Sequence, residues 1–429
     1  MEFFDAIANM SALSFAQHMV NGISLGSLYA LIAIGYTMVY GILLMINFAH
    51  GDIVMMACYF AFFGITAFHI PWYFTFIITI IMTALLGVLI ERSAYRPLRE
   101  APKNSILISA IGASFLLENL ANYLFSGRPM RFPDVPLLSQ NISVGGIEIQ
   151  AICLVIPVVT IISLVVLLHI VNHTKTGMAM RAVSKDYEIA RVMGINIDNV
   201  ISITFIIGSA LAAIGAIMYG IRYPGITPMM GVMPGLKCFI AAVIGGIGNI
   251  KGAVLGGFIL GLGEILIVAF FPDLSGYRDA FAFIVLIVIL FYKPTGLLGE
   301  KNNGEGVIMT RKRDALLTIA GIIVLFGLAF FVQEEMDSYI RRIVNLCLVY
   351  AIIGLSMNLT NGFVGQFSLG QAGFMAIGAY TVGIFTVPVE FRENVFYAVP
   401  MNPLIAGYRA AAVGGAAFWA ACLPRCLRL

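Results

Sequence analysis

Residues 172–199 read NHTKTGMAMRAVSKDYEIARVMGINIDN, a polar stretch in a strongly apolar chain. An apolar run precedes it at 151–171 and another follows at 200–219, each long enough to cross a bilayer as a helix. The stretch is much longer than a simple turn, and its apolar residues recur at roughly helical spacing, which predicts two short helices. Two interpretations stay open: a solvated loop that orients the protein, or an element that docks into a groove on a soluble partner. The apolar stripe consists of Ala182, Ile189, Ala190, Met193 and Ile195.

The pattern Glu188-x-Ala190-x-x-x-Gly194 resembles the EAA loop of ABC-importer permeases, the coupling helix that sits in a cleft of the ATPase. The surrounding GMAMRAVSKDYEIARVMGINIDNV is similar to the version in branched-chain amino-acid permeases, although Ile189 replaces the first alanine and no Leu-Pro follows. The resemblance favours docking. Gly194 is predicted to end the second short helix, because glycine tolerates the left-handed conformation, and Glu188 is expected to cap a turn or pair with a basic residue of the partner. The coupling-loop residues are Arg181, Asp186, Glu188, Ala190 and Gly194.

The composition predicts an all-α polytopic membrane protein. Of the 429 residues, 60% are hydrophobic and 11% are charged, and the mean hydropathy is +0.96, whereas soluble domains carry about 25% charged residues. The six cysteines are scattered, mostly within apolar runs, which favours small core residues over a disulfide framework or a metal site. Residues 1–17 lack the basic head of a signal peptide, so the first span is expected to direct insertion itself.

The basic residues fall on one predicted side of the membrane. Residues 1–17 contain no lysine or arginine, whereas the loops at 91–103, 172–199 and 293–313 are basic. The positive-inside rule therefore places the N-terminus outside and these loops in the cytoplasm, in a plasma or inner membrane. The Pro-rich segment 127–150 is expected to be external. The predicted spans up to this point are residues 18–45, 53–70, 74–90, 105–125, 151–171 and 200–219.

Residues 236–271 do not fit a single span, because GGIGN at 245–249 interrupts them. The first piece is too short to cross, since a span needs about 20 residues. We expect a short or re-entrant helix, a cytoplasmic tip at 249–251, a full span from Gly252 and a last span at 279–292. Broken helices at membrane depth are tolerated where protein buries them or where they line a cavity. The break is therefore either part of a transport path or a Gly-rich packing seam.

Polar and ionisable groups within apolar spans are candidates for lining a path, because lipid disfavours them. For the ionisable groups an interhelical hydrogen bond is the simpler role, and for His50 and Asp52 an interfacial cap. No group of histidines has metal-ligand spacing and no Walker A pattern occurs, so the chain is expected to hydrolyse no ATP and to need no cofactor. The candidate path residues are Asn47, His50, Gly51, Asp52, Glu118, Gly245, Gly246, Gly248 and Glu264.

After a polar linker at 301–313 the pattern starts again. Residues 350–380 align without gaps to residues 29–59, at a constant offset of 321, which predicts the start of a second, homologous unit. Residues 408–429 shift to Ala, Gly, Cys and Arg, and no second docking loop follows the linker. Tyr29, Ala30, Ile32, Gly41 and Tyr59 recur as Tyr350, Ala351, Ile353, Gly362 and Tyr380.

Residues 1–300 resemble a complete branched-chain amino-acid ABC permease of the LivH type, through INFAHGD at 46–52, the docking loop and AAVIGGIGNIKGAVLGGFILGLGE at 241–264. Residues 314–429 resemble the truncated N-terminal half of its LivM-type partner, through GLSMNLTNGFVGQFSLGQAGFMAIGAY at 354–380. The resemblance implies a permease bundle of about eight or nine membrane segments plus about four more from the incomplete unit.

The resemblance also implies a function: a non-enzymatic permease subunit that forms the translocation path of an ATP-driven importer of Leu, Ile and Val. The implied partners are two cytoplasmic ABC ATPase subunits, a LivM-type second permease, an external amino-acid-binding protein and the lipid bilayer, with no nucleic acid. Three alternatives stay open: the same machinery for urea, short amides or sugars, a gradient-driven secondary transporter, and a non-functional fusion fragment.

Overall fold

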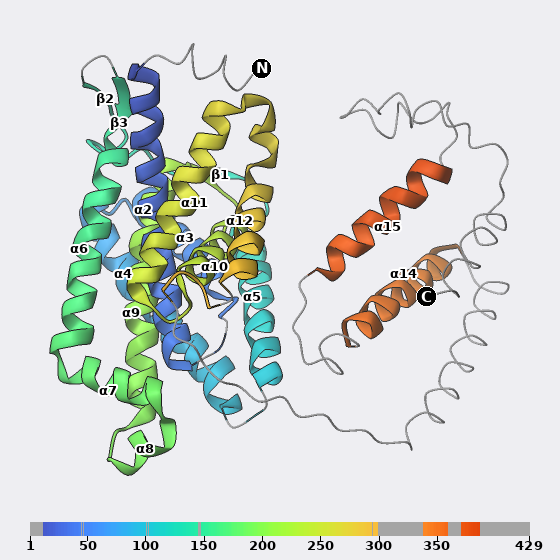
Figure 1. The fold of residues 1–429 in the computed structure, drawn as a ribbon, viewed down its shortest axis with the longest axis horizontal. Helices are drawn as coiled ribbons and strands as arrows, with labels where there is room; N and C mark the ends of the chain where they lie inside the picture. The colour runs from blue at the N-terminus through green and yellow to red at the C-terminus, as the bar shows by residue number, and fades with distance from the viewer. Residues whose placement is uncertain are drawn as a thin grey trace. The chain divides into compact units, whose positions relative to one another are not determined.

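The computed structural model describes residues 12–298, apart from 44, 46, 100, 102, 145, 146 and 294, together with 338–358 and 370–386. The chain divides into two compact units, Met1–Gly304 and Glu305–Leu429. Unit 1 is a bundle of helices with short strands at one end (Figure 1). Six of its described helices are long and apolar enough to cross a membrane, so the predicted all-α polytopic membrane architecture is confirmed.

The helices of unit 1 follow the apolar segments predicted from the sequence, because each segment is long, rich in residues that fit a helix and bounded by polar or Gly/Pro-containing breaks. The apolar helices are α2 (Ala12–Leu43), α3 (His50–Thr66), α4 (Trp72–Ile90), α5 (Lys103–Phe125), α6 (Ala151–His173), α9 (Ile197–Arg222), α10 (Val232–Gly245), α11 (Ile250–Phe270) and α12 (Arg278–Tyr292).

Helix α2 forms the centre of unit 1. It is buried continuously from Ser24 to Val39 and packs against α11, α9, α6 and α10. Glycines make the contact with α11 close: a Cβ added to Gly261 would lie 2.2 Å from the backbone nitrogen of Gly26. Small residues at such crossings let two helices approach closely in a membrane.

Two of the apolar helices, α3 and α10, begin inside the bundle. His50 opens α3, and its Nε2 lies 3.2 Å from the carbonyl oxygen of Ile32 in the body of α2. The N-terminal ends of α3 and α10 touch, since a Cβ added to Gly51 would lie 2.4 Å from the carbonyl oxygen of Gly231. With 17 residues α3 is at the lower limit for a span, and with 14 residues α10 is too short to cross. The short helix predicted before the GGIGN break is therefore present as α10.

Short elements connect the helices at the two ends of the bundle. At one end, β1 (Met130–Arg131) pairs with β4 (Gly225–Ile226), and β2 (Asn141–Val144) pairs with β3 (Ile147–Gln150), both antiparallel. The opposite end carries α7 (Lys175–Lys185) and α8 (Tyr187–Val192) (Figure 1). The remaining short elements are the π-helix η1 (Glu91–Tyr95) and the 3₁₀ helices η2 (Arg96–Leu98) and η3 (Pro272–Tyr277).

The described part of unit 2 holds α14 (Ser338–Asn358) and α15 (Gln371–Thr386). Helix α15 begins 321 residues after α3, since 371 − 50 = 321, which is the offset of the sequence repeat. The linker predicted at 301–313 and the segment 408–429 lie outside the described residues.

Candidate functional site

The polar stretch at 172–199 folds as two short helices, as predicted, and capping residues set where they begin. The Thr174 hydroxyl accepts a hydrogen bond from the backbone nitrogen of Gly177 at 3.0 Å, which starts α7. The Asp186 carboxylate accepts from the backbone nitrogens of Glu188 and Ile189 at 2.8 and 2.9 Å, which starts α8. Such caps satisfy backbone donors that have no partner within the helix. The capping role considered for Glu188 thus belongs to Asp186, and the Glu188 side chain is exposed.

Gly194 follows the end of α8 with a φ of +81°. A Cβ at this position would have no neighbour within 4 Å, so the backbone conformation, not space, favours glycine. The backbone nitrogen of Gly194 donates to the carbonyl of Arg191, and that of Ile195 donates to the carbonyl of Ala190. The prediction that Gly194 ends the short helix is confirmed.

The two short helices present apolar side chains to solvent. Ala190 is buried, whereas Val192 is 86% exposed and Ile189 and Met193 are also exposed. Met178 of α7 is exposed as well. The predicted stripe is therefore divided: Ala190 faces the bundle, whereas Ile189 and Met193 face outward. Met178 and Val192, which are also exposed, were not part of the predicted stripe. We call the exposed set the apolar tip: Met178, Ile189, Val192 and Met193.

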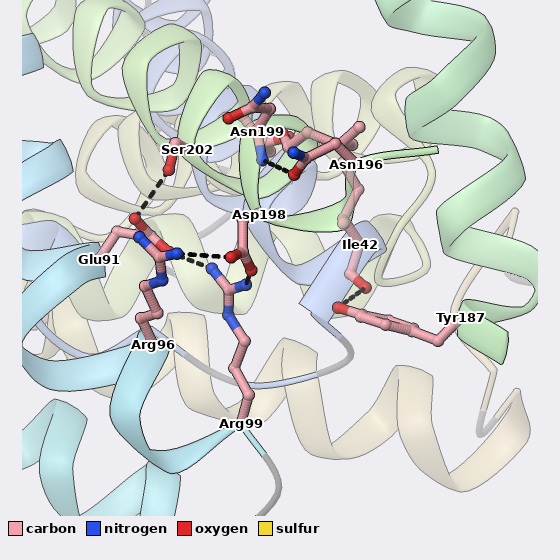
Figure 2. A network of polar contacts seen from close by, with 11 residues as sticks. Ile42, Glu91, Arg96, Arg99, Tyr187, Asn196, Asp198, Asn199 and Ser202 are labelled. Atoms are coloured by element: carbon pink, nitrogen blue, oxygen red, sulfur yellow. Dashed lines mark hydrogen bonds and ion pairs between the residues drawn. The ribbon is translucent and has the colours of Figure 1, made fainter. Parts of the chain in front are cut away.

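A polar network connects the end of this loop to the bundle (Figure 2). Asp198, in the first turn of α9, accepts from Arg96 Nη2 at 2.6 Å and also binds Arg99. Arg99 donates to the fully buried Glu91 of η1, which also accepts from the Ser202 hydroxyl at 2.9 Å. The network thus joins the first turns of α9 to the segment that follows α4.

A second contact connects the loop to α2. The Tyr187 hydroxyl donates to the carbonyl oxygen of Ile42 at 3.2 Å (Figure 2). This carbonyl lies in the last turn of α2 and has no partner within its own helix. Burial raises the pKa of Tyr187, and the nearby Arg99 opposes that shift. From the sequence, the arginines at 92–99 were used only to orient the chain in the membrane, so the ionic network and the contact of Tyr187 with α2 were not predicted. The available signal for the network was Glu91, an acidic residue at the end of a span next to an arginine-rich segment.

Arg181, the first of the predicted loop residues, has a local role. Its Nη1 lies 3.2 Å from the Asn172 side-chain oxygen at the end of α6. The bond ties α7 back to the helix before it, and the side chain of Arg181 remains exposed.

The candidates at the start of α3 are buried and bonded to other helices. Asn47 Oδ1 accepts from the Tyr95 hydroxyl at 2.7 Å, and Asp52 accepts from the Ser114 hydroxyl of α5. His50 bonds to α2 and Gly51 contacts α10, as described above; Ile46 lies outside the described residues. The structure brings Asn47, His50, Gly51 and Asp52 together. These contacts match the simpler interhelical role, and lining of a path stays a prediction.

The glycines of the break between α10 and α11 are packed against other backbone. A Cβ added to Gly245 would lie 1.9 Å from the carbonyl oxygen of Gly252, and Gly246 and Gly248 have φ of +104° and +91°. The backbone nitrogens of Leu297 and Leu298 donate to the carbonyls of Ile244 and Gly245, both at 2.8 Å. The geometry is that of a packing seam, and a path role for these glycines stays a prediction.

Glu264 belongs to a buried ionic cluster around Lys237 of α10. Lys237 Nζ lies 2.9 and 3.0 Å from the two carboxylate oxygens of Glu264 and 2.8 Å from Oδ1 of Asp279. The Tyr29 hydroxyl also donates to Glu264 at 3.1 Å. These contacts fix α10 to α2, α11 and α12. This cluster was not predicted from the sequence. Its signal was Lys237 within an apolar segment, because a charged side chain in a membrane span needs a partner.

Glu118 lies near Asp52 in the cluster at the start of α3, because Ser114, one turn before it on α5, donates to Asp52. Its side chain is partly exposed.

A cavity of about 540 Å³ lies at the strand end of the bundle and is lined by residues such as Arg131, Asp134 and Gln150. None of the predicted site residues lines it. Within the described parts of the chain, no group of three or more His, Cys, Asp or Glu side chains is arranged to hold a metal ion.

Comparison with known proteins follows the same division of the chain. A family model described as "Branched-chain amino acid transport system / permease component" matches residues 18–290 and 339–426. The high-affinity branched-chain amino acid transport system permease protein BraD of Pseudomonas aeruginosa is 43% identical over 301 residues, which are 67% of this chain and 96% of that protein. The corresponding protein LivH of Escherichia coli (strain K12) is 42% identical over 302 residues, with the same shares of the two chains.

A more distant relative, the probable branched-chain amino acid transport permease protein LivH of Methanocaldococcus jannaschii, is 25% identical over 287 residues, 64% of this chain and 89% of the relative. No solved structure matches. The match of the family model to most of the chain and the identity to BraD and LivH agree: the chain belongs to the family of permease components of branched-chain amino acid transport systems.

Proposed function

We propose that this chain is the permease subunit of an ATP-driven importer of Leu, Ile and Val, and that the loop at 172–199 couples it to separate ATPase subunits. The observation that carries the proposal is the apolar tip, because exposed apolar side chains on a polar loop indicate a protein partner. The relatives are named for branched-chain amino acid transport, which supports the substrate class.

The contacts around the loop support a route for mechanical coupling. Helices α6 and α9 continue directly from the loop, Tyr187 binds the last turn of α2, and Asp198 binds the segment after α4 through Arg96 and Arg99. Closure of the ATPases on the apolar tip displaces the loop, and these contacts pass the displacement to four helices of the bundle. The result is alternating access of the path to the two sides of the membrane.

The domain assignment is part of the proposal. Residues 1–300 are the LivH-type permease, residues 301–313 are a cytoplasmic linker, and residues 314–429 correspond to the N-terminal half of a LivM-type permease. The match of the family model to 339–426 and the shared offset of α3 and α15 support the second assignment.

The partners we propose are two ATPase subunits, a LivM-type permease subunit and an external amino-acid-binding protein. The N-terminus lies outside an inner membrane and the apolar tip lies in the cytoplasm. The contact of Arg96 and Arg99 with Asp198 supports this orientation, because it brings two basic loops to the same end of the bundle.

We also propose that the path passes the start of α3, at Asn47, His50, Gly51 and Asp52. These polar groups lie where two helices are broken, and broken helices in transporters place binding groups at membrane depth. Competition for uptake by Leu, Ile and Val, against urea, short amides and sugars, tests the substrate class.

Co-purification tests the coupling proposal. The chain is expressed with the ATPase subunits, extracted in detergent and captured by a tag on the chain. We expect Val192→Asp and Gly194→Asp each to reduce the recovered ATPase by about tenfold or more, because a charge enters an apolar contact. Leu137→Asp is the matched control, since Leu137 is an exposed apolar residue with positive φ at the strand end. Retention of ATPase and normal uptake in both loop variants would reject the proposal.

A further inference from the structure

The outer face of α6 changes character at the end that carries the loop. Along the body of this helix the exposed side chains form one apolar stripe, as contact with lipid chains requires. His169 and His173 continue the same stripe at helical spacing, and both side chains are exposed. From Ala151 to His169 the helix rises about 27 Å at 1.5 Å per residue, so the histidines lie where a hydrocarbon layer of about 30 Å ends. The apolar stripe consists of Leu154, Val158, Ile161, Ile162, Val165 and Val166.

The two histidines are held side by side. Their ring centroids are 5.1 Å apart and the ring planes differ by 5°. Arg181 of α7 is exposed and reaches back to the same turn, because its Nη1 lies 3.2 Å from the side-chain oxygen of Asn172. An imidazole has an apolar body and a polar tip. A pair of imidazoles at this depth can therefore touch lipid chains and still offer N–H donors to a headgroup.

Helix α7 turns away from the end of α6 (Figure 1) and adds positive charge there. Its first residue, Lys175, is exposed and follows His173 by two positions, and the start of a helix carries partial positive charge. The turn is tightly packed, since a Cβ added to Gly177 would lie 2.3 Å from the carbonyl oxygens of Ile170 and Val171. The position of Lys175 beside the histidines is therefore fixed by the backbone.

This group of side chains has no counter-charge of its own. Within the part of the chain that the structure describes, no ion pair joins any of them to a carboxylate. The histidines also lack a third ligand for a metal ion, because no group of three or more suitable side chains occurs among the described residues. We call the set the α6–α7 corner: His169, His173, Lys175 and Arg181.

We propose that the α6–α7 corner binds the phosphate of an anionic phospholipid, whose acyl chains lie along the apolar stripe of α6. Imidazole N–H groups, an ammonium, a guanidinium and a helix N-terminus are all donors that suit a phosphate. The stripe runs directly into the corner, so one amphipathic molecule fills both, whereas a free anion would leave the stripe uncovered. Basic groups at a helix end attract anionic lipid in the same way in other membrane proteins.

The bound lipid also has a consequence for coupling, which rests on the proposed function. The corner lies where the span α6 continues into the loop at 172–199. A lipid held there anchors the start of the loop to the membrane, so that displacement of the apolar tip moves the helices and not the loop alone.

Native mass spectrometry of the full chain in detergent tests the site. The chain is titrated with phosphatidylglycerol or with phosphatidylcholine, and bound lipids are counted. We expect tighter binding of phosphatidylglycerol, and a loss of about five- to tenfold in its affinity when His169→Phe, His173→Phe and Lys175→Gln are combined. Phenylalanine keeps the ring and removes the donor. The matched control combines Arg92→Gln with Lys251→Gln, two exposed basic residues outside the corner, and should lose less than about twofold.

Three results would overturn the proposal. One is equal binding of the two lipids, and another is an equal loss of affinity in the control and in the corner variant. The third is displacement of phosphatidylglycerol by inorganic phosphate at a similar concentration, because the corner would then be a site for free anions.

Reconstitution of the complex with its ATPases gives a second measurement. Adding phosphatidylglycerol to phosphatidylcholine nanodiscs should lower the ATP hydrolysed per amino acid imported by the unmodified complex, and should have no such effect on the corner variant. An equal response of both complexes would reject the consequence for coupling. Failure of the proposed function is distinct, because then the ATPases would not accompany even the unmodified chain, while the lipid counts on the chain alone would still decide the site.

Discussion

Both the loop at 172–199 and the break between α10 and α11 interrupt apolar sequence, and both contain glycine with positive φ. Their surroundings are opposite. Gly194 in the loop has no neighbour within 4 Å, whereas Gly245 in the break lies against the backbone of Gly252. The loop keeps its polar and apolar side chains available to a partner, while the break uses glycine to bring two helices together.

The difference comes from what surrounds the glycine in the sequence. The loop is long and supplies its own caps at Thr174, Asp186 and Asn196, so its helices form without being covered. The break is short, and its backbone must be covered by protein because lipid leaves polar backbone groups unsatisfied. Changes near the break should therefore damage folding, and changes in the loop should damage coupling.

The largest effect is expected from breaking the ion cluster that holds α10. Lys237→Met should destabilise the protein by about 3–5 kcal/mol, because it leaves the fully buried Glu264 carboxylate without its main partner. Replacing both residues, as Lys237→Met with Glu264→Leu, should cost less than the single change. Thermal unfolding of the detergent-solubilised protein measures both variants. If the double variant is less stable than Lys237→Met, the loss of stability comes from losing the attraction between the two residues and not from leaving Glu264 charged and unpaired.

The next effect compares the glycines directly. Gly245→Ala should destabilise by about 3 kcal/mol, at the upper end of overpacking costs, because the new Cβ meets backbone at 1.9 Å. Gly194→Ala should cost only about 1 kcal/mol, since its Cβ is free and only the left-handed backbone is strained. Fluorescence-detected size exclusion after a heating series compares them. Equal losses of folded protein would break the distinction drawn between loop and break.

A smaller effect on stability than that of Lys237→Met or Gly245→Ala is expected at the junction of loop and bundle. Arg99→Ala should cost about 1–3 kcal/mol, because it leaves the buried Glu91 with fewer partners. Arg96→Ala should cost no more than about 1 kcal/mol, because that pair is half exposed. In reconstituted complexes, Arg99→Ala should also raise the ATP hydrolysed per amino acid imported. An unchanged ratio in Arg99→Ala would show that this network does not carry the coupling.

Much of the helical framework was predictable because membrane spans are defined by local sequence. The start of α3 within INFAHGD and the glycine end of α8 follow from a polar interruption and from one residue type. The strands were not predicted: β1 pairs with β4 across a long sequence separation, and strands this short leave no periodic pattern.

The candidate site was only partly predictable. Gly194 and the two short helices are local features, but the direction of each side chain is not. Whether Ile189 faces outward and Ala190 inward depends on how the loop rests on the bundle. The contacts of Glu91 with Arg99 and of Tyr187 with α2 join segments far apart in sequence, and a single sequence gives no information on such pairs.

The length of α2 has a mechanical consequence. Its 32 residues correspond to about 48 Å at 1.5 Å per residue, against a hydrocarbon layer of about 30 Å. Because α2 is buried while α4 and α6 present the apolar outer surface, the hydrophobic thickness that the bilayer must match is set by those outer helices. The length of α2 therefore does not itself require the surrounding lipid to stretch or thin.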